Sequence, residues 1–318
     1  MTEEEMMQTM TQIMDGLMPA NDMANFLTTL ADRGETVDEI VGAARVLRSR
    51  ARTIKAPPDS VDCCGTGGDG LHTYNISTAV ALVAAACGVP VAKHGNRAAS
   101  SKSGAADVLE ALGVNLSITP RQAEEALRQI NFTFLMAPQH HEAMKHVAPV
   151  RKQLGRKTIF NLLGPLANPG MTKRQLIGVY DKKWIEPMAQ ALKRLGTERA
   201  WVVHGRDGMD EISITGPTQV AVLDQDQVSF QTLTPDDFGL PAHKLDDLRG
   251  GDVSTNAAAL RGLLEGKKSA YRDAVLANTA AVLVIHGSSY ALKDATGRAA
   301  QAIDSGAARK ILEAYKSV

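Results

Sequence analysis

The sequence has 318 residues and equal numbers of acidic and basic side chains, 35 of each, so its formal net charge is zero. This balance argues against a general nucleic-acid-binding surface, and no apolar run reaches the ~18 residues that a membrane span needs. Its three cysteines, Cys63, Cys64 and Cys87, form neither a disulfide framework nor a C-x-x-C metal motif. Because the acidic N-terminal segment also lacks a signal-peptide pattern, we expect a globular cytoplasmic protein of one large or two moderate domains.

The first 58 residues predict a small helical unit. Thr2 with Glu5, and Thr36 with Glu39, match the capping-box pattern with which helices begin. Methionines and branched apolar residues follow each box at helical spacing, which is typical of ordinary core helices. A Pro-Pro pair at 57–58 marks the predicted end of the unit.

Residues 61–136 alternate between strand patterns and helix patterns. The predicted strands are 61–64, 89–92 and 132–136, and the predicted helices are 79–87 and a segment that begins at the Thr119–Gln122 cap and ends at Ile130. Alternation of this kind predicts a largely parallel sheet with helices on its faces. Ligands of such sheets bind at the carboxyl ends of the strands.

A glycine-rich loop, GTGGDG at 65–70, follows the first of these strands, and a basic segment, KHGNR at 93–97, follows the second. Backbone N–H groups of glycine loops and of helix N-termini bind phosphate. A dinucleotide site would need an acidic residue for the ribose, but none lies between Gly70 and Asp107, and a Walker motif is absent. We therefore expect a highly phosphorylated ligand other than a dinucleotide, with a structural turn beside a solvated basic loop as the alternative.

Residues 137–169 are rich in histidines and cations. His141 and Glu142 match the start of the zinc-protease motif, which needs two histidines four residues apart on one helical face. Here His141 and His146 are five residues apart. We interpret these histidines as polar surface residues or as residues that line a cleft. Arg151 is, on the residues alone, one of several surface cations.

The rest of the chain returns to strands and helices. Strands are predicted at 175–180, 199–204, 218–223 and 227–233, and helices at 184–195, 256–264, 269–284 and 293–315, with a buried strand near 281–285 as an alternative. Asp210 and Glu211 follow the second of these strands. Adjacent carboxylates suit Mg²⁺, which is usually bound through one or two carboxylates plus substrate phosphates; an ordinary acidic turn is the alternative.

Five motifs carry a resemblance to one enzyme family. They are GTGGDG at 65–70, NIST at 75–78, KHGNR at 93–97, SSKSG at 100–104 and VRKQLGRKTIFNLLGPL at 150–166. Together they resemble the anthranilate phosphoribosyltransferases, over nearly the whole chain. The resemblance implies an α/β fold class with a small all-helical domain, 1–58 joined by 139–165, beside a larger α/β domain with a mostly parallel central sheet, 59–138 and 166–318.

The resemblance also implies an activity. The family transfers 5-phosphoribosyl from phosphoribosyl pyrophosphate to anthranilate, giving N-(5-phosphoribosyl)anthranilate and pyrophosphate, in tryptophan biosynthesis. It implies Mg²⁺ as cofactor, two ions per active site, and a homodimer that binds neither nucleic acid nor membrane. Compared with the family, the chain starts about one helix late and has Glu142 where proline is frequent, and we expect activity to survive both differences.

Specific residues can be assigned roles only through this resemblance. It implies that Arg151, Asn96 and His94 act in the reaction, and that Ser77, Asp210 and Glu211 hold the metal. The substrate-binding positions that it implies are Gly65, Gly68, Asp69, Thr73, Asn75, Ile76, Ser77, Thr78, Lys93, His94, Gly95, Asn96, Arg97, Ala98, Ala99, Ser100, Ser101, Ala105 and Arg151.

Two alternative functions remain open at this point. A pyrimidine nucleoside phosphorylase of the same fold has a related glycine loop and lysine loop, but its lysine is usually followed by His-Ser rather than by His-Gly-Asn. A non-catalytic binder of phosphorylated ligands or nucleic acid is the other alternative. The intact Asp210-Glu211 pair, Arg151 and the balanced charge argue against it.

Overall fold

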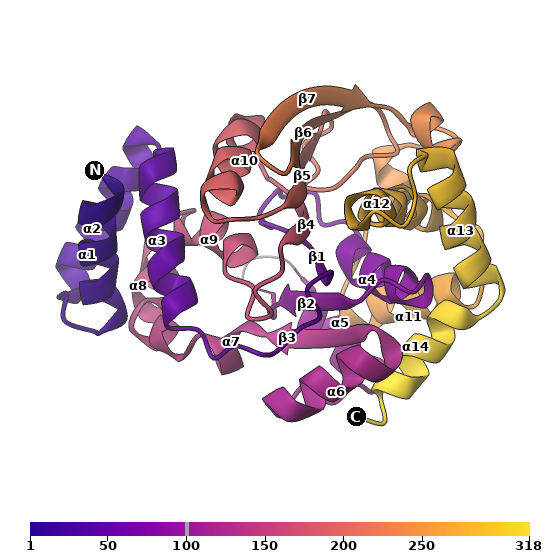
Figure 1. The fold of residues 1–318 in the computed structure, drawn as a ribbon, viewed down its shortest axis with the longest axis horizontal. Helices are drawn as coiled ribbons and strands as arrows, with labels where there is room; N and C mark the ends of the chain where they lie inside the picture. Colours follow the sequence, from indigo (N-terminus) through magenta and orange to yellow (C-terminus); the bar gives the residue numbers. More distant parts are fainter. Residues whose placement is uncertain (99–101) are drawn as a thin grey trace.

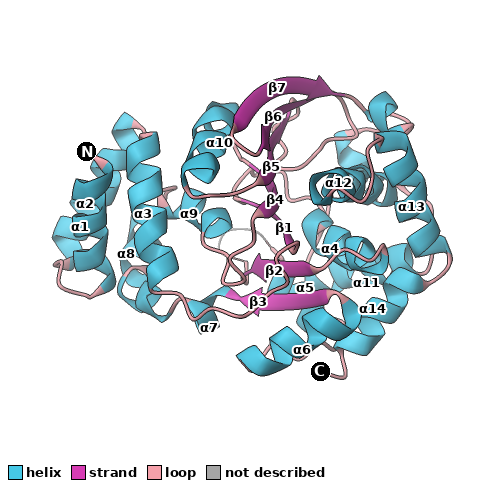
Figure 2. Cartoon of the chain, in the orientation of Figure 1, coloured by secondary structure: helices cyan, strands magenta, loops and turns pink. Residues whose placement is uncertain are grey.

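The computed structural model describes residues 1–98 and 102–318. A seven-stranded sheet in the order β3-β2-β1-β4-β5-β6-β7 runs through the molecule, with helices on both faces and a helical bundle at one side (Figures 1 and 2). The strands are β1 (Val61–Gly65), β2 (Val91–Gly95), β3 (Phe132–Met136), β4 (Arg174–Gly178), β5 (Arg199–Gly205), β6 (Thr218–Asp224) and β7 (Gln227–Leu233). β1 to β5 pair in parallel, whereas β6 and β7 are antiparallel. The predicted fold class is therefore confirmed.

The helices follow the predicted alternation. Those before and around the first three strands are α1 (Glu3–Met14), α2 (Ala20–Arg33), α3 (Val37–Ser49), α4 (Ile76–Ala86), α5 (Ala105–Ala111), α6 (Pro120–Ile130) and α7 (Ala137–His140). Those that follow are η1 (Glu142–His146), α8 (Ala148–Leu154), α9 (Phe160–Leu166), η2 (Lys182–Trp184), α10 (Ile185–Arg194), η3 (Pro235–Phe238), η4 (Leu245–Leu248), α11 (Val253–Leu264), α12 (Ala270–His286), α13 (Leu292–Asp304) and α14 (Ala307–Tyr315). In the described part of the chain, no helix combines the length and apolar character that crossing a membrane requires.

The strand register aligns the carboxyl ends of the parallel strands at one edge of the sheet. Gly65 of β1 lies opposite Gly178 of β4, and Gly178 lies opposite Val203 of β5. On the other side, Gly95 of β2 lies opposite Met136 of β3. The loops that follow β1, β2 and β5 therefore emerge at the same edge, where an α/β sheet binds its ligand.

One core joins the N-terminal helices to one face of the sheet. Both predicted capping boxes form, Thr2 with Glu5 and Thr36 with Glu39, and begin α1 and α3. Apolar side chains of α1, α2 and α3 share this core with α8, α9, α10 and one face of β4 to β6. Figure 1 shows these helices on the same side of the sheet. The division into two domains at 58, 139 and 165 stays a prediction.

A second core fills the opposite face of the sheet, beneath α4 and α11 to α14 (Figure 2). The alternative strand near 281–285 is wrong, because α12 continues without a break to His286. Residues 279–283 of α12 are buried on every side, since the helix packs on α4, α13 and the sheet at once. A short apolar run buried all round has no periodicity that distinguishes helix from strand.

Candidate active site at the carboxyl edge of the sheet

The glycine loop after β1 is shaped by left-handed backbone conformations. Gly67, Gly68 and Gly70 have φ angles of 67°, 78° and 78°, which residues with side chains rarely adopt. The Thr66 N–H donates to the Gly178 carbonyl oxygen over 2.9 Å, and Thr66 Oγ1 accepts the N–H of Tyr180 over 3.0 Å. The loop is thereby fixed to the end of β4 with its glycine backbone exposed.

The acidic pair after β5 lies directly against this loop. The Gly67 N–H donates to Asp210 Oδ2 over 2.7 Å. A Cβ atom at Gly65 would lie 2.3 Å from the same oxygen, and a Cβ at Gly178 would lie 1.5 Å from the Asp210 carbonyl oxygen. The fold thus brings carboxylates and phosphate-binding amides together at one point, as the sequence predicts for a phosphorylated ligand with a cation.

The electrostatics of the pair favour a bound cation. Burial raises the pKa of Asp210, and the neighbouring Asp69 raises it further. Burial also raises the pKa of Glu211, with Asp210 adding to the effect, while Lys93 and a hydrogen bond from the Ser77 backbone oppose it. Neighbouring carboxylates repel one another when both are ionised, and a divalent cation would offset this repulsion. The residues therefore fit Mg²⁺, although no group of three or more potential ligand side chains is assembled in residues 1–98 and 102–318.

Two residues that the sequence analysis missed hold the acid-bearing loop: Asn278, which is buried, and Asp207, which is half-buried. Asn278 of α12 accepts the Ile212 N–H and donates to the Ile212 carbonyl oxygen, both over 2.9 Å. Asp207 accepts hydrogen bonds from the hydroxyls of Ser213 and Thr215, each over 2.6 Å. An asparagine in the otherwise apolar run of α12 was the available signal for Asn278.

Lys93 is a buried residue of β2 and does not belong to the loop that follows this strand. Its buried Nζ donates to the Cys63 carbonyl oxygen over 2.6 Å and to Ser77 Oγ over 3.1 Å. Asp62, which the sequence analysis did not single out, accepts the His94 N–H over 3.2 Å. Burial raises the pKa of Asp62, and Lys93 opposes the rise. A charged residue inside the apolar run of β1 could have indicated it.

His94 is neutral and has one unused ring nitrogen. Its Nδ1 lies 3.2 Å from the Gly164 carbonyl oxygen, so this nitrogen carries the proton and donates. Its Nε2 is buried and has no partner within the described residues. Burial, reinforced by His141, lowers the pKa of His94 to about 3. His94 is therefore a hydrogen-bond acceptor rather than a cation at neutral pH.

The histidines at 140, 141 and 146 have different surroundings. His141 is buried, its Nε2 lies 2.9 Å from the Ala167 carbonyl oxygen, and its ring centre lies 5.2 Å from that of His94. Burial lowers the pKa of His141 to about 4. His146, in contrast, is exposed. The interpretation as a polar surface therefore holds for His146 but is wrong for His141, which packs inside beside His94.

Arg151 and the basic loop have different surroundings. Arg151 of α8 is partly buried, with its guanidinium carbon 5.6 Å from the ring centre of Phe160, and burial lowers its pKa. Asn96 is exposed. Arg97 is paired with Asp107, 3.1 Å away, so the structure ties it to α5. The predicted positions Ala99, Ser100 and Ser101 lie outside the described residues.

The remaining predicted positions line the segments on either side of α4. Asn75 accepts a hydrogen bond from Asn256 Nδ2 over 2.9 Å, and its carbonyl oxygen accepts the Tyr271 hydroxyl over 3.1 Å. Thr73 forms a β-bridge with Arg249, and Ile76 and Thr78 are buried. The Ala98 N–H donates to Asp107, and Gly95 lies against Ala105 and Phe134. Neither Asn256 nor Tyr271 was singled out from sequence.

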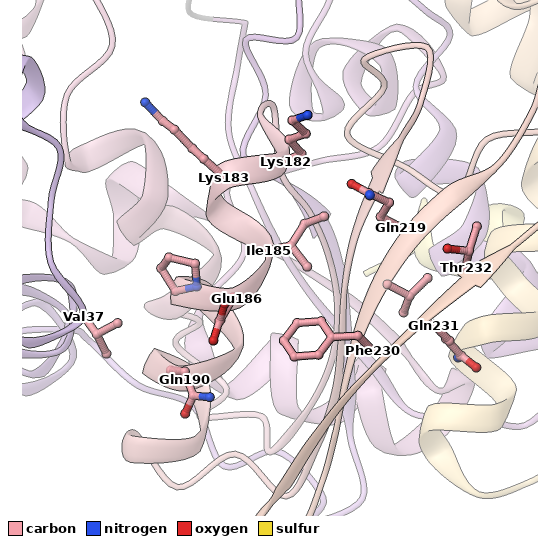
Figure 3. A pocket seen from close by; sticks show the side chains of 12 residues that line it. Val37, Lys182, Lys183, Ile185, Glu186, Gln190, Gln219, Phe230, Gln231 and Thr232 are labelled. Atoms are coloured by element: carbon pink, nitrogen blue, oxygen red, sulfur yellow. The ribbon is translucent and has the colours of Figure 1, made fainter.

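A separate groove of about 620 Å³ lies between α10, the start of α3 and strands β6 and β7. Figure 3 shows Phe230 of β7 beside Ile185 of α10, with Gln190 and Gln219 near them. Phe230 is 59% exposed. None of the predicted site residues lines this groove. The predicted site residues therefore lie apart from this groove.

Comparisons with known proteins agree with this geometry. Residues 57–309 match the model of the α/β domain of a glycosyl transferase family, and residues 1–51 match its helical bundle domain. The chain is 56% identical over 306 residues to an anthranilate phosphoribosyltransferase from Azospirillum brasilense, covering 96% of this chain and 86% of that protein. A relative from Rhodospirillum rubrum is 54% identical over 312 residues, covering 98% and 90%. The chain belongs to the anthranilate phosphoribosyltransferase family.

Solved structures of family members have the same fold. The crystal structure of the Thermus thermophilus enzyme superposes with a TM-score of 0.94 at 43% identity, covering 100% of this chain and 95% of that one. The Saccharomyces cerevisiae enzyme in complex with PRPP and Mg gives a TM-score of 0.87 at 31% identity, covering 94% and 85%. The chain is thus a pentosyltransferase of tryptophan biosynthesis by family.

Proposed function

We propose that the residues around the glycine loop carry out the reaction of the family. This reaction transfers 5-phosphoribosyl from phosphoribosyl pyrophosphate to the amine of anthranilate and releases pyrophosphate. The observation that carries the proposal is the contact between Gly67 and Asp210, which joins phosphate-binding amides to a carboxylate pair. The yeast relative, whose structure holds PRPP and Mg, supports the same substrate and cofactor for this chain.

On the donor side, the main task is to stabilise the leaving group. Breaking the C1–O bond develops positive charge on the ribose and negative charge on the pyrophosphate, so preoriented charges and dipoles lower the barrier. The exposed amide of Gly68 would bind the phosphates, since the Gly67 N–H already donates to Asp210. Ser77, Asp210 and Glu211 would hold Mg²⁺, in two ions per site. When bound, Mg²⁺ supplies positive charge to the departing pyrophosphate.

On the acceptor side, positioning matters more than proton transfer. The amine of anthranilate is already neutral at pH 7, so a strong general base is not required. Arg151 would bind the anthranilate carboxylate through a two-pronged hydrogen bond, and Asn96 and Gly65 would contact the ring. The unused Nε2 of neutral His94 would accept an N–H of the amine and orient its lone pair.

The resemblance also underlies three proposals about the protein as a whole. We propose a cytoplasmic homodimer that binds phosphoribosyl pyrophosphate and anthranilate but no nucleic acid. Light scattering would give the mass of the assembly in solution. A mass equal to the monomer at micromolar concentration would contradict the dimer.

The test of the reaction follows anthranilate fluorescence in the presence of phosphoribosyl pyrophosphate, with and without Mg²⁺. We expect consumption that requires both. Arg151→Ala should then raise the KM for anthranilate by about 10- to 100-fold, since a charged hydrogen bond contributes roughly 1.5–3 kcal/mol. Lys152→Ala, a change of the exposed neighbour on α8, serves as the control. A folded protein that consumes no anthranilate would refute the proposal, and phosphate-dependent cleavage of a pyrimidine nucleoside would replace it.

A further inference from the structure

We propose that Lys157 is an additional phosphate-binding residue, which reaches the glycine loop from the segment between α8 and α9 and binds the pyrophosphate group of the donor. This inference rests on the proposed function, because it concerns the same substrate. Nothing in the sequence patterns assigns a role to Lys157 beyond membership of a motif. The assignment comes from three features of its surroundings.

The first feature is the position of the ammonium group. A Cβ atom at Gly68 would lie 3.1 Å from Lys157 Cε and 3.8 Å from Nζ. Nζ also lies 3.8 Å from the centre of the Tyr180 ring. The charge is therefore held between the glycine loop and an aromatic face, although the two residues are 89 positions apart (157 − 68). Gly68 has a positive φ and is exposed, so its backbone is accessible from solvent.

The second feature is the rigid attachment of Tyr180 to the same loop. The Tyr180 N–H donates to Thr66 Oγ1 over 3.0 Å, and its hydroxyl accepts the indole N–H of Trp184 over 3.0 Å. Both ends of Tyr180 are thus fixed, while its ring face meets the ammonium of Lys157. An ammonium over an aromatic face is held in place but keeps hydrogen-bond donors for a further partner.

The third feature is that the charge of Lys157 is not compensated. Within residues 1–98 and 102–318, Lys157 has no hydrogen bond and no salt bridge. Its neighbour Arg156, in contrast, is paired with Asp32 of α2 over 2.5 Å. An unpaired cation beside a loop of exposed glycine amides is suited to a polyanion, for which lysine is a common point-charge ligand.

Lys157 and the glycine loop belong to different parts of the molecule. The glycine loop belongs to the sheet, whereas Arg156 ties the segment of Lys157 to the N-terminal helices. A pyrophosphate held by Gly68 and Lys157 together would therefore bridge these two parts of the molecule. Binding of the donor would therefore strengthen the contact between them.

The test compares Lys157→Met and Lys157→Arg with Lys183→Met as the control. Lys183 of η2 is also a lysine above an aromatic ring, 5.0 Å from the centre of Trp184, but it lines the separate groove between α10 and β7 (Figure 3). We expect Lys157→Met to raise the KM for phosphoribosyl pyrophosphate and the inhibition constant of pyrophosphate by about tenfold or more. The KM for anthranilate should stay within about twofold of the natural value, and Lys157→Arg should restore most of the loss.

Calorimetric titration of Mg²⁺-pyrophosphate keeps this inference separate from the reaction itself. If the natural chain binds pyrophosphate but consumes no anthranilate, the proposed function fails, and weaker pyrophosphate binding by Lys157→Met still supports the role of Lys157. Pyrophosphate affinity equal to that of Lys183→Met would overturn it. A loss shared equally by both substrates, or a lowered melting temperature, would also overturn it, because either result indicates a structural role.

Discussion

The Gly67 N–H and the Asp210 carboxylate are joined by a hydrogen bond of 2.7 Å, although 143 residues separate them in the chain. The contact is possible because the backbone of Asp210 packs on Gly178, where any side chain would collide with it. Glycines at the ends of two adjacent strands therefore determine how closely the acidic loop approaches the phosphate-binding loop. Substitution of these glycines is a direct test of the site.

Gly178→Ala should abolish most of the activity. Its new Cβ would lie 1.5 Å from the Asp210 carbonyl oxygen, so the loop that bears the acidic pair must move. A displacement of about 1 Å at a reacting site lowers the rate by roughly 100-fold. Gly216→Ala is the matched control, since a Cβ there meets nothing within 4 Å. Anthranilate consumption by both variants gives the comparison, and full activity of Gly178→Ala would contradict the described packing.

Asn278→Ala should weaken both stability and the response to Mg²⁺. It leaves the buried N–H and carbonyl groups of Ile212 without partners, which destabilises the fold by about 2–4 kcal/mol and loosens the neighbouring Glu211. Thr279→Val is the control in the next position of α12. The Thr279 hydroxyl is buried and has no partner within the described residues, so its removal should change little. Urea unfolding and the Mg²⁺ concentration for half-maximal activity measure the two effects. Equal values for Asn278→Ala and Thr279→Val would contradict the role of Asn278 in holding the loop at Ile212.

His94 should not titrate between pH 5 and pH 8, as its pKa is lowered by burial to about 3. An unfolded chain takes up this proton below about pH 6.5 whereas the folded protein does not, so the ring lowers the stability of the fold as the pH falls from 6.5 towards 3. Nitrogen chemical shifts of the ring, assigned with His94→Gln, report the protonation state directly. A midpoint near 6.5 would show that Nε2 is solvated rather than available to the acceptor amine.

Local sequence signals predicted most of the fold. Thr2 and Thr36 begin their helices through side-chain bonds to residues three positions on, so the pattern contains the whole interaction. The strands were predicted within a few residues because each is a short apolar run bounded by polar or glycine residues. The alternative strand near 281–285 was wrong because this stretch of α12 is buried on every side by segments distant in the chain. Hydrophobic periodicity identifies an element only when one face is buried and the other is exposed.

The site residues also differ in whether a local sequence pattern could predict them. Asp210 and the glycine loop were predicted because they follow strands whose carboxyl ends must meet at one edge. The roles of Arg151 and His94 came from the family resemblance alone. The placement of Lys157 and the inward placement of His141 depend on contacts between segments far apart in the chain, which no local pattern encodes. For Asn278, the sequence shows a polar residue in an apolar stretch but not the Ile212 backbone that it contacts.

Acid unfolding should begin in the N-terminal helices, where Glu39 is fully buried at the start of α3. Burial alone raises its pKa. The hydrogen bonds from Arg33, the terminal amino group and the Thr36 N–H outweigh this effect and lower the pKa to about 2. The folded pKa thus lies below the ordinary glutamate value of 4.5. The resulting stabilisation is complete above the unfolded value and is lost as the pH falls from about 5 towards 2.

Glu39→Gln should remove this pH dependence. We expect the variant to lose about 1–3 kcal/mol of unfolding free energy at pH 7, because Arg33 and the Thr36 N–H lose a charged partner, and progressively less towards pH 3. Glu5→Gln makes the same change in the capping box of α1, where the side chain is exposed, and should have a smaller effect at every pH. Urea unfolding at pH 7, 5, 4 and 3 measures both variants. A loss for Glu39→Gln that is the same at pH 3 as at pH 7 would mean that the carboxylate is not the acid-sensitive group of this core.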